Sequence, residues 1–294
     1  MKEYDYIIAG AGIAGTVCGK LLAQKGKHCI ILESQDCPHE KICGGFIPHR
    51  AIVLLKYLGL DPDSLFDEGA IKISGVITKK NQIIEKHKYH NKGYGMGVYR
   101  ILLQKMLIKQ AMDCGCEIKY SERVSCINRI NNSYYINGFS AKHFISAIGA
   151  RSLSRNYPLD WRNNQTYGIS EIIKGEFHLE KDYVYFFYPN ENCLDYFWFI
   201  PIYKDVWNVG YWSTSYIHLK NTFFHLRGIY VPQYFKNITT LRIPKGAICG
   251  SEDYSFILNK NAYGIGDYAG TCSPDSGAGI FSAIKSAKDL VQSF

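Results

Sequence analysis

The 294-residue chain lacks several features that would each define a class of protein. No apolar run reaches the ~18 residues that a helix needs to cross a bilayer, so we expect no transmembrane segment. No block of about five or six like charges is present, so we expect no nucleic-acid partner. The ten cysteines form no CxxC pair and no His/Cys cluster with zinc spacing, so we expect no bound metal. Internal repeats and low-complexity tracts are also missing, which favours a folded globular protein.

The cysteines and the charges indicate the cellular compartment and the kinds of partner that we expect. No secretory leader precedes the first apolar strand pattern, so we expect a cytoplasmic protein whose cysteines are free thiols. The net charge of +8 is spread along the chain, with small clusters at Lys79, Lys80, Lys86, Lys88 and Lys92. This pattern is typical of a solvated basic surface. It also allows attraction to an anionic substrate or peripheral contact with a membrane.

Aromatic residues are abundant, with 23 Tyr, 15 Phe and 4 Trp, and they concentrate between Tyr183 and Tyr230. Aromatic side chains favour strands, so we expect strands throughout the region from about residue 166 to residue 257. Two interpretations stay open for these side chains. They either fill a core or line a pocket for a flat or apolar ligand.

The first chemical motif is a set of three glycines between an apolar run and a helical pattern, at Gly10, Gly12 and Gly15. A second apolar run, Cys29–Leu32, then ends at Glu33. This order of strand, glycine turn, helix, strand and acid is typical of a dinucleotide-binding βαβ unit. The first glycine permits a tight turn, the second lets the backbone approach a pyrophosphate, and the third allows close helix packing. Ala14 begins the helix beside the phosphates, and Glu33 can accept hydrogen bonds from an adenosine ribose.

A second glycine-rich turn lies near the C-terminus. An apolar strand, Ala262–Ile265, leads into Gly266 and Asp267, and a helix is predicted from about Ala278. A carboxylate at this position can hydrogen-bond a polyol. The helix N-terminus can stabilise negative charge on a reduced ring, and its residues are Gly277, Gly279 and Ile280. We expect both turns to meet in space, so that one nucleotide site is assembled from the two ends of the chain.

This turn resembles the Gly-Asp motif of flavoproteins of the p-hydroxybenzoate hydroxylase fold. The resemblance implies FAD as the cofactor, with Asp267 at its ribityl chain. It also implies that Arg100, at the start of a helix predicted over residues 99–114, contacts FAD and that the backbone of Val124 contacts adenine. Many relatives carry Ala-Asp-Gly-x-x-Ser around the position of Gly149. Here Ile148 replaces the aspartate, which argues against a standard hydroxylase cycle with tight NADPH coupling.

The segment Lys41-Ile42-Cys43-Gly44-Gly45 narrows the resemblance, because it is similar to the Lys-x-Cys-Gly-Gly segment of the geranylgeranyl reductase family. Two residues without a Cβ let the backbone run against a planar ring, and Cys43 places a thiol there. The resemblance therefore implies that Lys41, Gly44 and Gly45 lie at the cofactor. The alternative is that Cys43 only packs in the core.

A second segment of that family is Tyr-x-Trp-x-Phe-Pro followed by Asn-Val-Gly. The chain resembles it at residues 196–201 and 208–210, with Ile200 in place of Phe. Alternation along a strand places three of these side chains on one face. We expect a wall of the substrate pocket formed by Tyr196, Trp198, Ile200 and Pro201, unless these residues are plain core.

These patterns together predict an α/β fold. It combines a Rossmann-like FAD-binding domain of the p-hydroxybenzoate hydroxylase and glutathione reductase type with an interleaved antiparallel β-rich substrate domain. We expect the FAD-binding domain to comprise residues 1–70, 98–165 and 260–294. The substrate-binding domain is then residues 71–97 and 166–259.

The resemblance implies an FAD-dependent oxidoreductase that reduces C=C bonds of a small hydrophobic or aromatic molecule of isoprenoid or polyketide type. Electrons would come from NAD(P)H or another reductant, including an electron-donor protein. Cys43 is the candidate catalytic proton donor, because a thiol beside the ring can deliver a proton to the second carbon. His49 is either a second proton relay or a surface histidine, and Cys272 could form a redox pair with Cys43.

Three alternatives stay open. A flavin monooxygenase acting on an aromatic or polyketide substrate fits the same fold. A flavin halogenase would need a lysine between flavin and substrate, and Lys72 is the candidate. A non-catalytic flavoprotein that only retains the nucleotide site belongs to a different class.

Overall fold

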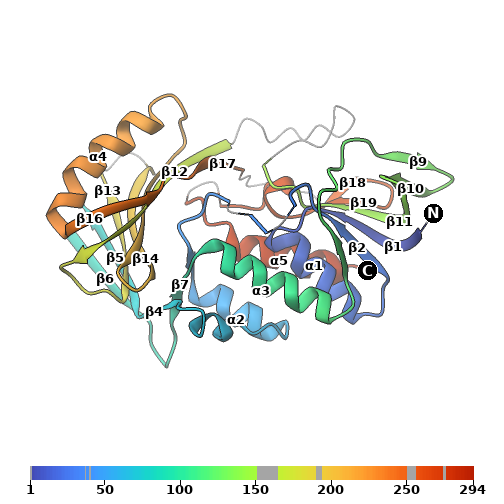
Figure 1. The fold of residues 1–294 in the computed structure, drawn as a ribbon, viewed down its shortest axis with the longest axis horizontal. Helices are drawn as coiled ribbons and strands as arrows, with labels where there is room; N and C mark the ends of the chain where they lie inside the picture. Colours follow the sequence, from blue (N-terminus) through green and yellow to red (C-terminus); the bar gives the residue numbers. More distant parts are fainter. Residues whose placement is uncertain are drawn as a thin grey trace.

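The computed structural model describes residues 2–36, 38–39, 41–150, 165–189, 194–249, 256–273 and 276–294. In these ranges the chain forms two eight-stranded sheets and a three-stranded sheet. Figure 1 shows the two large sheets at opposite ends of the long axis. The predicted α/β class is confirmed.

The first sheet is built on the N-terminal strand β1 (Lys2–Ala9), in the order β18-β19-β11-β1-β2-β8. Neighbours from β19 to β8 run parallel, and they are β19 (Ala262–Gly264), β11 (Phe139–Ser146), β2 (Cys29–Leu32) and β8 (Glu117–Lys119). Antiparallel strands complete the sheet at β18 (Ile257–Asn259), β10 (Ser133–Ile136) and β9 (Asn128–Ile130). Because β1 pairs with β11 and β11 with β19, strands from both ends of the chain lie in one sheet.

Helices pack against one face of this sheet. They are α1 (Ile13–Gln24), α3 (Arg100–Asp113) and α5 (Ile280–Gln292), and α2 (His49–Tyr57) packs on α5. Figure 1 shows α1, α3 and α5 close together beside the strands. The largest apolar core joins buried strand residues such as Ile8 and Ile31 to buried helix residues such as Val17 and Leu103. Helix α5 begins two residues later than the sequence predicts, since Gly279 is its N-cap.

The second sheet has the order β16-β12-β15-β14-β13-β5-β6, with β17 paired to β12. Its strands are β5 (Gly75–Lys80), β6 (Ile83–Lys88), β12 (Gln165–Phe177), β13 (Tyr183–Tyr188), β14 (Tyr196–Tyr203), β15 (Val206–Ser213), β16 (Phe235–Arg242) and β17 (Lys245–Cys249). Only the β5–β13 pair runs parallel among the pairs recorded in this sheet. The aromatic region thus supplies most of an antiparallel sheet.

The expectation of strands throughout residues 166–257 is wrong at one place, where helix α4 (Leu219–Tyr234) covers β12, β15 and β16 (Figure 1). Its aromatic residues, Gly228 and Pro232 all disfavour a helix in isolation. Helical spacing nevertheless gathers one buried face of Leu219, Phe223 and Leu226. Burial of that face against the sheet outweighs local propensity.

A three-stranded sheet connects the two large ones, with β7 (Gly95–Gly97) between β3 (Phe46–Ile47) and β4 (Ile71–Ile73). A short 3-10 helix, η1 (Pro62–Phe66), follows α2. A second one, η3 (Gly266–Ala269), follows β19. Within the ranges described above, no helix has the length and apolar character needed to span a membrane.

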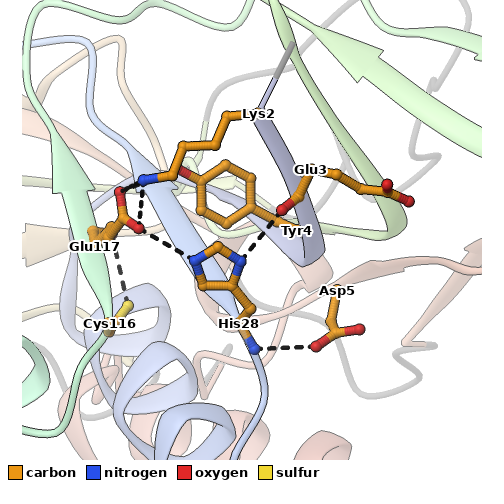
Figure 2. Close-up of polar contacts among 7 residues, drawn as sticks. All are labelled: Lys2, Glu3, Tyr4, Asp5, His28, Cys116 and Glu117. Atoms are coloured by element: carbon orange, nitrogen blue, oxygen red, sulfur yellow. Dashed lines mark hydrogen bonds and ion pairs between the residues drawn. The ribbon is translucent and has the colours of Figure 1, made fainter.

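A polar cluster fastens the edge of the first sheet (Figure 2). The Glu117 carboxylate on β8 accepts hydrogen bonds from Lys2 Nζ at 2.6 Å and from Tyr4 Oη at 3.0 Å, both on β1. His28 Nε2 lies 3.2 Å from the other carboxylate oxygen, and its ring stacks on Tyr4 at 4.5 Å. The cluster therefore ties β1 and the start of β2 to β8.

Candidate active site

One cavity of about 1200 Å³ is lined by residues of both large sheets. The first sheet contributes the carboxyl ends of β1, β2 and β11, which is where open α/β sheets bind ligands. The second sheet contributes side chains of β13, β14 and β15. All the predicted site residues line this cavity except three, which are Gly15, Gly45 and Pro201.

The N-terminal glycines have different surroundings. Gly10 has φ +99°, and a Cβ there would lie 2.7 Å from the Ala147 carbonyl oxygen. A Cβ on Gly15 would lie 2.0 Å from the Gly10 carbonyl oxygen, so Gly15 is needed for close packing and not for cavity contact. A Cβ on Gly12 would meet no protein atom within 4 Å. The space beside Gly12 therefore belongs to the cavity.

The start of α1 is suited to an anion. Its N-cap, Gly12, offers no side-chain cap, and no acidic residue occupies the first turn. The amides of the first helical turn therefore have no acidic residue within that turn and border the cavity at Gly12, Ile13 and Ala14, as in phosphate-binding turns. Gln104 on α3 donates to the Ala11 carbonyl at 2.9 Å and braces the turn, a contact that no sequence pattern predicts.

Glu33 follows β2 and is only 4% exposed. One carboxylate oxygen accepts from Ala11 N at 2.8 Å and the other from Gln35 N at 3.0 Å. The second oxygen also accepts from Ser34 Oγ at 3.1 Å. These bonds hold the carboxylate at the cavity, and the oxygen bonded to Ala11 N retains a lone pair for a further donor. Val124 lies in the same part of the cavity lining.

The C-terminal turn lines another part of the cavity. Asp267 accepts from Lys41 Nζ at 2.6 Å, and the same ammonium group would lie 3.2 Å from a Cβ on Gly149. Helix α5 starts at Ile280 with no side-chain cap and no acid in its first turn. The predicted meeting of the two chain ends therefore occurs around one cavity, which Arg100 at the start of α3 also lines.

The Cys43 loop approaches the cavity beside β14. Cys43 is partly buried, and its Sγ accepts from Gly45 N at 3.4 Å. A Cβ on Gly44 would lie 2.6 Å from Ile200 Cδ1, and a Cβ on Gly45 would lie 2.4 Å from the Val98 carbonyl oxygen. The backbone contact and φ of +82° thus already require glycine at position 45, whereas at position 44 the end of the Ile200 side chain could move aside. The sequence pattern by itself indicated only the face of a planar ligand as the reason for these glycines.

The aromatic side chains of the second sheet both fill the core and line the cavity, because successive side chains of a strand point to opposite faces of the sheet. Phe197 and Phe199 lie in the core beneath α4, whereas Tyr196 and Trp198 line the cavity. Tyr196 Oη donates to the Ser276 carbonyl at 2.6 Å, and burial raises the pKa of this tyrosine. Pro201 lies outside the lining.

Several residues that line the cavity are not among those predicted from the sequence. Phe186 and Tyr188 on β13 could have been found from strand alternation, since the aromatic cluster includes them. Tyr89, Arg50 and Arg242 carry no motif. The remaining unexpected residues include Phe46, Arg123 and Trp212. The Arg50 guanidinium lies over the Phe281 ring at 4.6 Å.

Three side chains with a chemical role suggested by the sequence lie outside the cavity lining, and they are His49, Lys72 and Cys272. His49 Nδ1 is 3.1 Å from the Tyr94 carbonyl oxygen, and Lys72 is exposed with its Nζ 5.2 Å from the Tyr94 ring. Cys272 is buried and, like Cys43, is a free thiol. No group of His, Cys, Asp and Glu residues able to hold a metal occurs in the described segments. Arg151 and Ser152 of the predicted Ala-x-Gly-x-x-Ser segment lie outside the described residues.

Residues 3–157 match the family model of the FAD binding domain, which is just over half of the chain. The chain belongs to this family, and its class is that of FAD-dependent oxidoreductases. FAD is the cofactor that the class uses, and the cavity fits it. The open space beside Gly12, the uncapped starts of α1 and α5, and the carboxylate of Glu33 are the donors and acceptors that a dinucleotide requires.

Known proteins with similar sequence or fold include reductases and halogenases. A menaquinone reductase of Mycobacterium tuberculosis is 24% identical over 177 residues, covering 56% of this chain and 43% of that protein. The chain thus spans less than half the length of this curated relative. A geranylgeranyl bacteriochlorophyll reductase-like protein from Thermoplasma acidophilum has TM-score 0.83 and 19% identity, covering 99% of this chain and 78% of the other.

The halogenase PltM has TM-score 0.78 and 16% identity, covering 98% of this chain and 69% of the other. Such identities show the fold alone. They confirm the predicted α/β fold with an FAD-binding part of the p-hydroxybenzoate hydroxylase type.

Proposed function

We propose that this protein reduces carbon–carbon double bonds of a hydrophobic, isoprenoid- or polyketide-like substrate with FAD as its cofactor. The observation that supports this most is the joining of two surfaces in one cavity. Nucleotide-binding turns line one part, an aromatic wall lines another, and Cys43 belongs to the same lining. We assign residues 1–70, 98–165 and 260–294 to the FAD-binding domain and residues 71–97 and 166–259 to the substrate-binding domain.

The cofactor contacts in this proposal follow from the groups that line the cavity. Amides at the start of α1, beside Gly12, bind the pyrophosphate, and Glu33 binds the ribose of the adenosine. The backbone at Val124 contacts adenine, and Asp267 binds the ribityl chain. The start of α5, which has no side-chain cap, would stabilise negative charge on the ring. Other groups bordering the cofactor are Ala14, Lys41, Gly44, Arg100, Gly149, Gly266, Gly277 and Gly279. Bound FAD supplies hydride-transfer chemistry.

The remaining groups act on the substrate. Tyr196, Trp198 and Ile200 form an apolar wall that excludes water and holds an extended apolar chain. The Cys43 thiol donates its proton to one alkene carbon while a hydride reaches the other, and solvent then reprotonates the thiolate. Two electrons and two hydrogens are thereby added across the double bond.

The Cys43→Ser variant tests this role. We expect bound FAD to remain and anaerobic reduction of a C20 polyprenol by dithionite-reduced protein to fall about 100-fold or more, because the proton donor is lost. Cys126→Ser is the matched control, since Cys126 is an exposed free thiol outside the cavity lining. Equal turnover in the Cys43 variant and wild type would show that Cys43 only packs.

Oxygen consumption distinguishes a reductase from a monooxygenase. Two observations argue against the oxygenase-type alternatives: Ile148 stands where relatives carry an aspartate, and Lys72 does not line the cavity. We therefore expect slow NADPH oxidation in air without substrate and faster reduction by a separate electron-donor protein. Rapid substrate-stimulated oxygen uptake with a hydroxylated product would favour the monooxygenase.

We also propose peripheral membrane contact through the β5–β6 hairpin. Ile83 and Ile84 are each 64% exposed, and lysines at positions 79, 80, 86 and 88 flank them. The base of the hairpin borders the cavity through Val76 and Tyr89. Apolar side chains surrounded by lysines suit an anionic lipid surface, from which a hydrophobic substrate can enter.

A further inference from the structure

The side chain of Asn208 on β15 links the aromatic wall to the Cys43 loop. Asn208 is 3% exposed. Its Oδ1 accepts a hydrogen bond from Trp198 Nε1 at 2.9 Å, and its Nδ2 donates to the Cys43 carbonyl oxygen at 2.9 Å. One buried amide therefore connects a wall residue and a loop residue that lie 155 positions apart in sequence.

The orientation of this amide follows from its partners. An indole N–H can only donate, so the amide oxygen must face Trp198. The amide nitrogen then faces the Cys43 carbonyl, which can only accept. Both hydrogen bonds therefore require the same orientation of the Asn208 amide. The bond from Trp198 fixes the amide oxygen, and this directs the amide nitrogen to the Cys43 carbonyl.

Two glycines leave room for the Trp198 ring beside Asn208. In the antiparallel pair, Trp198 lies opposite Gly210 and Ile200 lies opposite Asn208. A Cβ on Gly210 would lie 2.2 Å from Trp198 Cζ2, and a Cβ on Gly44 would lie 3.5 Å from Trp198 Nε1. The indole is therefore held between β15 and the loop. The Asn-Val-Gly segment therefore has two structural roles. Asn208 donates a hydrogen bond to the Cys43 carbonyl, and Gly210, having no side chain, leaves space for the Trp198 ring.

We propose that Asn208 is a positioning residue that fixes the peptide plane between Cys43 and Gly44, a role that extends the proposed function of the Cys43 thiol. In a trans peptide the Gly44 N–H points opposite to the Cys43 carbonyl, and therefore away from Asn208. Cys43 and Gly44 both line the cavity. Holding the carbonyl at Asn208 thus limits the rotation of this peptide and keeps the thiol in one place.

The test measures the rate at which iodoacetamide alkylates Cys43, located by mass spectrometry, as a ratio to wild type. We expect Asn208→Ala to be alkylated about tenfold faster at all pH values, because a hydrogen bond of typical strength no longer holds the loop. Asn208→Asp keeps an acceptor for Trp198 and loses the donor to Cys43 when ionised. Because position 208 is buried, the pKa of the introduced carboxyl lies well above its ordinary value of about 4, and at about pH 5 its O–H can still donate to the Cys43 carbonyl. Its ratio should therefore be near one at about pH 5 and rise to about tenfold at about pH 9, as the carboxyl loses its proton.

Thr166→Val is the matched control. It removes the hydrogen bond from another buried indole of the same sheet, Trp212 Nε1 to Thr166 Oγ1 at 3.0 Å, without touching the Cys43 carbonyl. Its ratio should stay near one. An Asn208→Ala ratio within twofold of one, or an equal increase in Thr166→Val, would overturn the proposal.

If circular dichroism shows that Asn208→Ala is unfolded, Trp198→Phe decides instead. It keeps a ring but removes the N–H that orients the amide, and it should raise the ratio by a smaller factor. No increase in a folded Trp198→Phe protein would also overturn the proposal. Alkylation is measured without substrate. Its result therefore tests the positioning role of Asn208 independently of the Cys43→Ser turnover experiment, which tests the proposed function.

Discussion

Gly12 and Gly15 lie three residues apart in the same turn, yet an added methyl group would meet different surroundings at each. At Gly12 it would enter the cavity, and the backbone angles there (φ −70°, ψ −175°) suit any residue. At Gly15 it would collide with the Gly10 carbonyl oxygen. Gly12 therefore borders the cavity in which we propose that FAD binds, whereas Gly15 is needed for packing.

Alanine substitutions separate these two roles. We expect Gly12→Ala to keep the wild-type melting temperature in the apo protein and to weaken FAD binding about tenfold or more, because the methyl group occupies space beside the α1 amides. Gly15→Ala should lower the free energy of unfolding by about 1–3 kcal/mol, as overpacking does. Fluorescence titration with FAD and thermal denaturation measure the two effects. Unaltered FAD affinity in Gly12→Ala would contradict the assignment of the cavity.

At the scale of elements, the edge cluster of Figure 2 shows how a short strand is retained. Strand β8 has three residues and joins the sheet beside β2. The hydrogen bond from Lys2, with further bonds from Tyr4 and His28, holds the pKa of Glu117 below its usual range. A carboxyl with a lowered pKa stabilises the fold when ionised, above the pKa of the unfolded chain.

The Glu117→Gln variant tests this contribution. We expect its melting temperature to be about 1–3 °C below wild type near pH 7, because the ion pair with Lys2 is exposed and weak. The difference should shrink as the pH falls below about 4, where Glu117 in the wild type also becomes protonated. Glu85→Gln, on the exposed strand β6, is the control. A difference that does not depend on pH would exclude an electrostatic origin.

Helix α4 is an element that residue patterns alone do not predict. Its aromatic and β-branched residues favour strands, and Pro232 lies inside it. The neighbouring sheet offers a large apolar face formed by residues such as Phe197, Phe199 and Trp207. Contacts over long sequence distances therefore decide its conformation.

At the scale of the whole molecule, the basic β5–β6 hairpin belongs to the second sheet, which also lines one side of the cavity. Strand β6 is the exposed edge of that sheet, and Val76 on β5 reaches the cavity lining. The proposed membrane contact depends on this connection between the exposed hairpin and the cavity, because a hydrophobic substrate would enter the cavity from the membrane beside the hairpin.

Vesicle sedimentation tests the contact. We expect wild type to bind phosphatidylglycerol vesicles and a Lys79→Glu/Lys80→Glu protein to bind about tenfold or more weakly, since each lysine near an anionic surface adds about 1 kcal/mol. Ile83→Ser/Ile84→Ser should also bind more weakly, whereas the control Ile130→Ser, exposed on β9, should not. Equal binding by all variants, or equal binding to phosphatidylcholine, would refute the contact.

The amino-acid sequence by itself determined the βαβ unit, the C-terminal Gly-Asp turn and the fold class, because these depend on local periodicity and on backbone conformations that few residues adopt. The glycine turn at Gly10 and Gly12 indicates a dinucleotide because both flanking strands, the helix and Glu33 follow in the required order. Strand alternation also placed Tyr196 and Trp198 on one face.

Only the tertiary structure decided what each of these residues contacts. Gly44 and Gly45 face Ile200 and Val98, Pro201 lies outside the cavity lining, and Asn208 reaches Cys43 across 165 positions. Such contacts depend on how two sheets pack, and that packing is the sum of many weak apolar contacts between distant segments. A local pattern therefore indicates the cofactor, while the shape of the cavity and the place of the thiol follow from the assembled sheets.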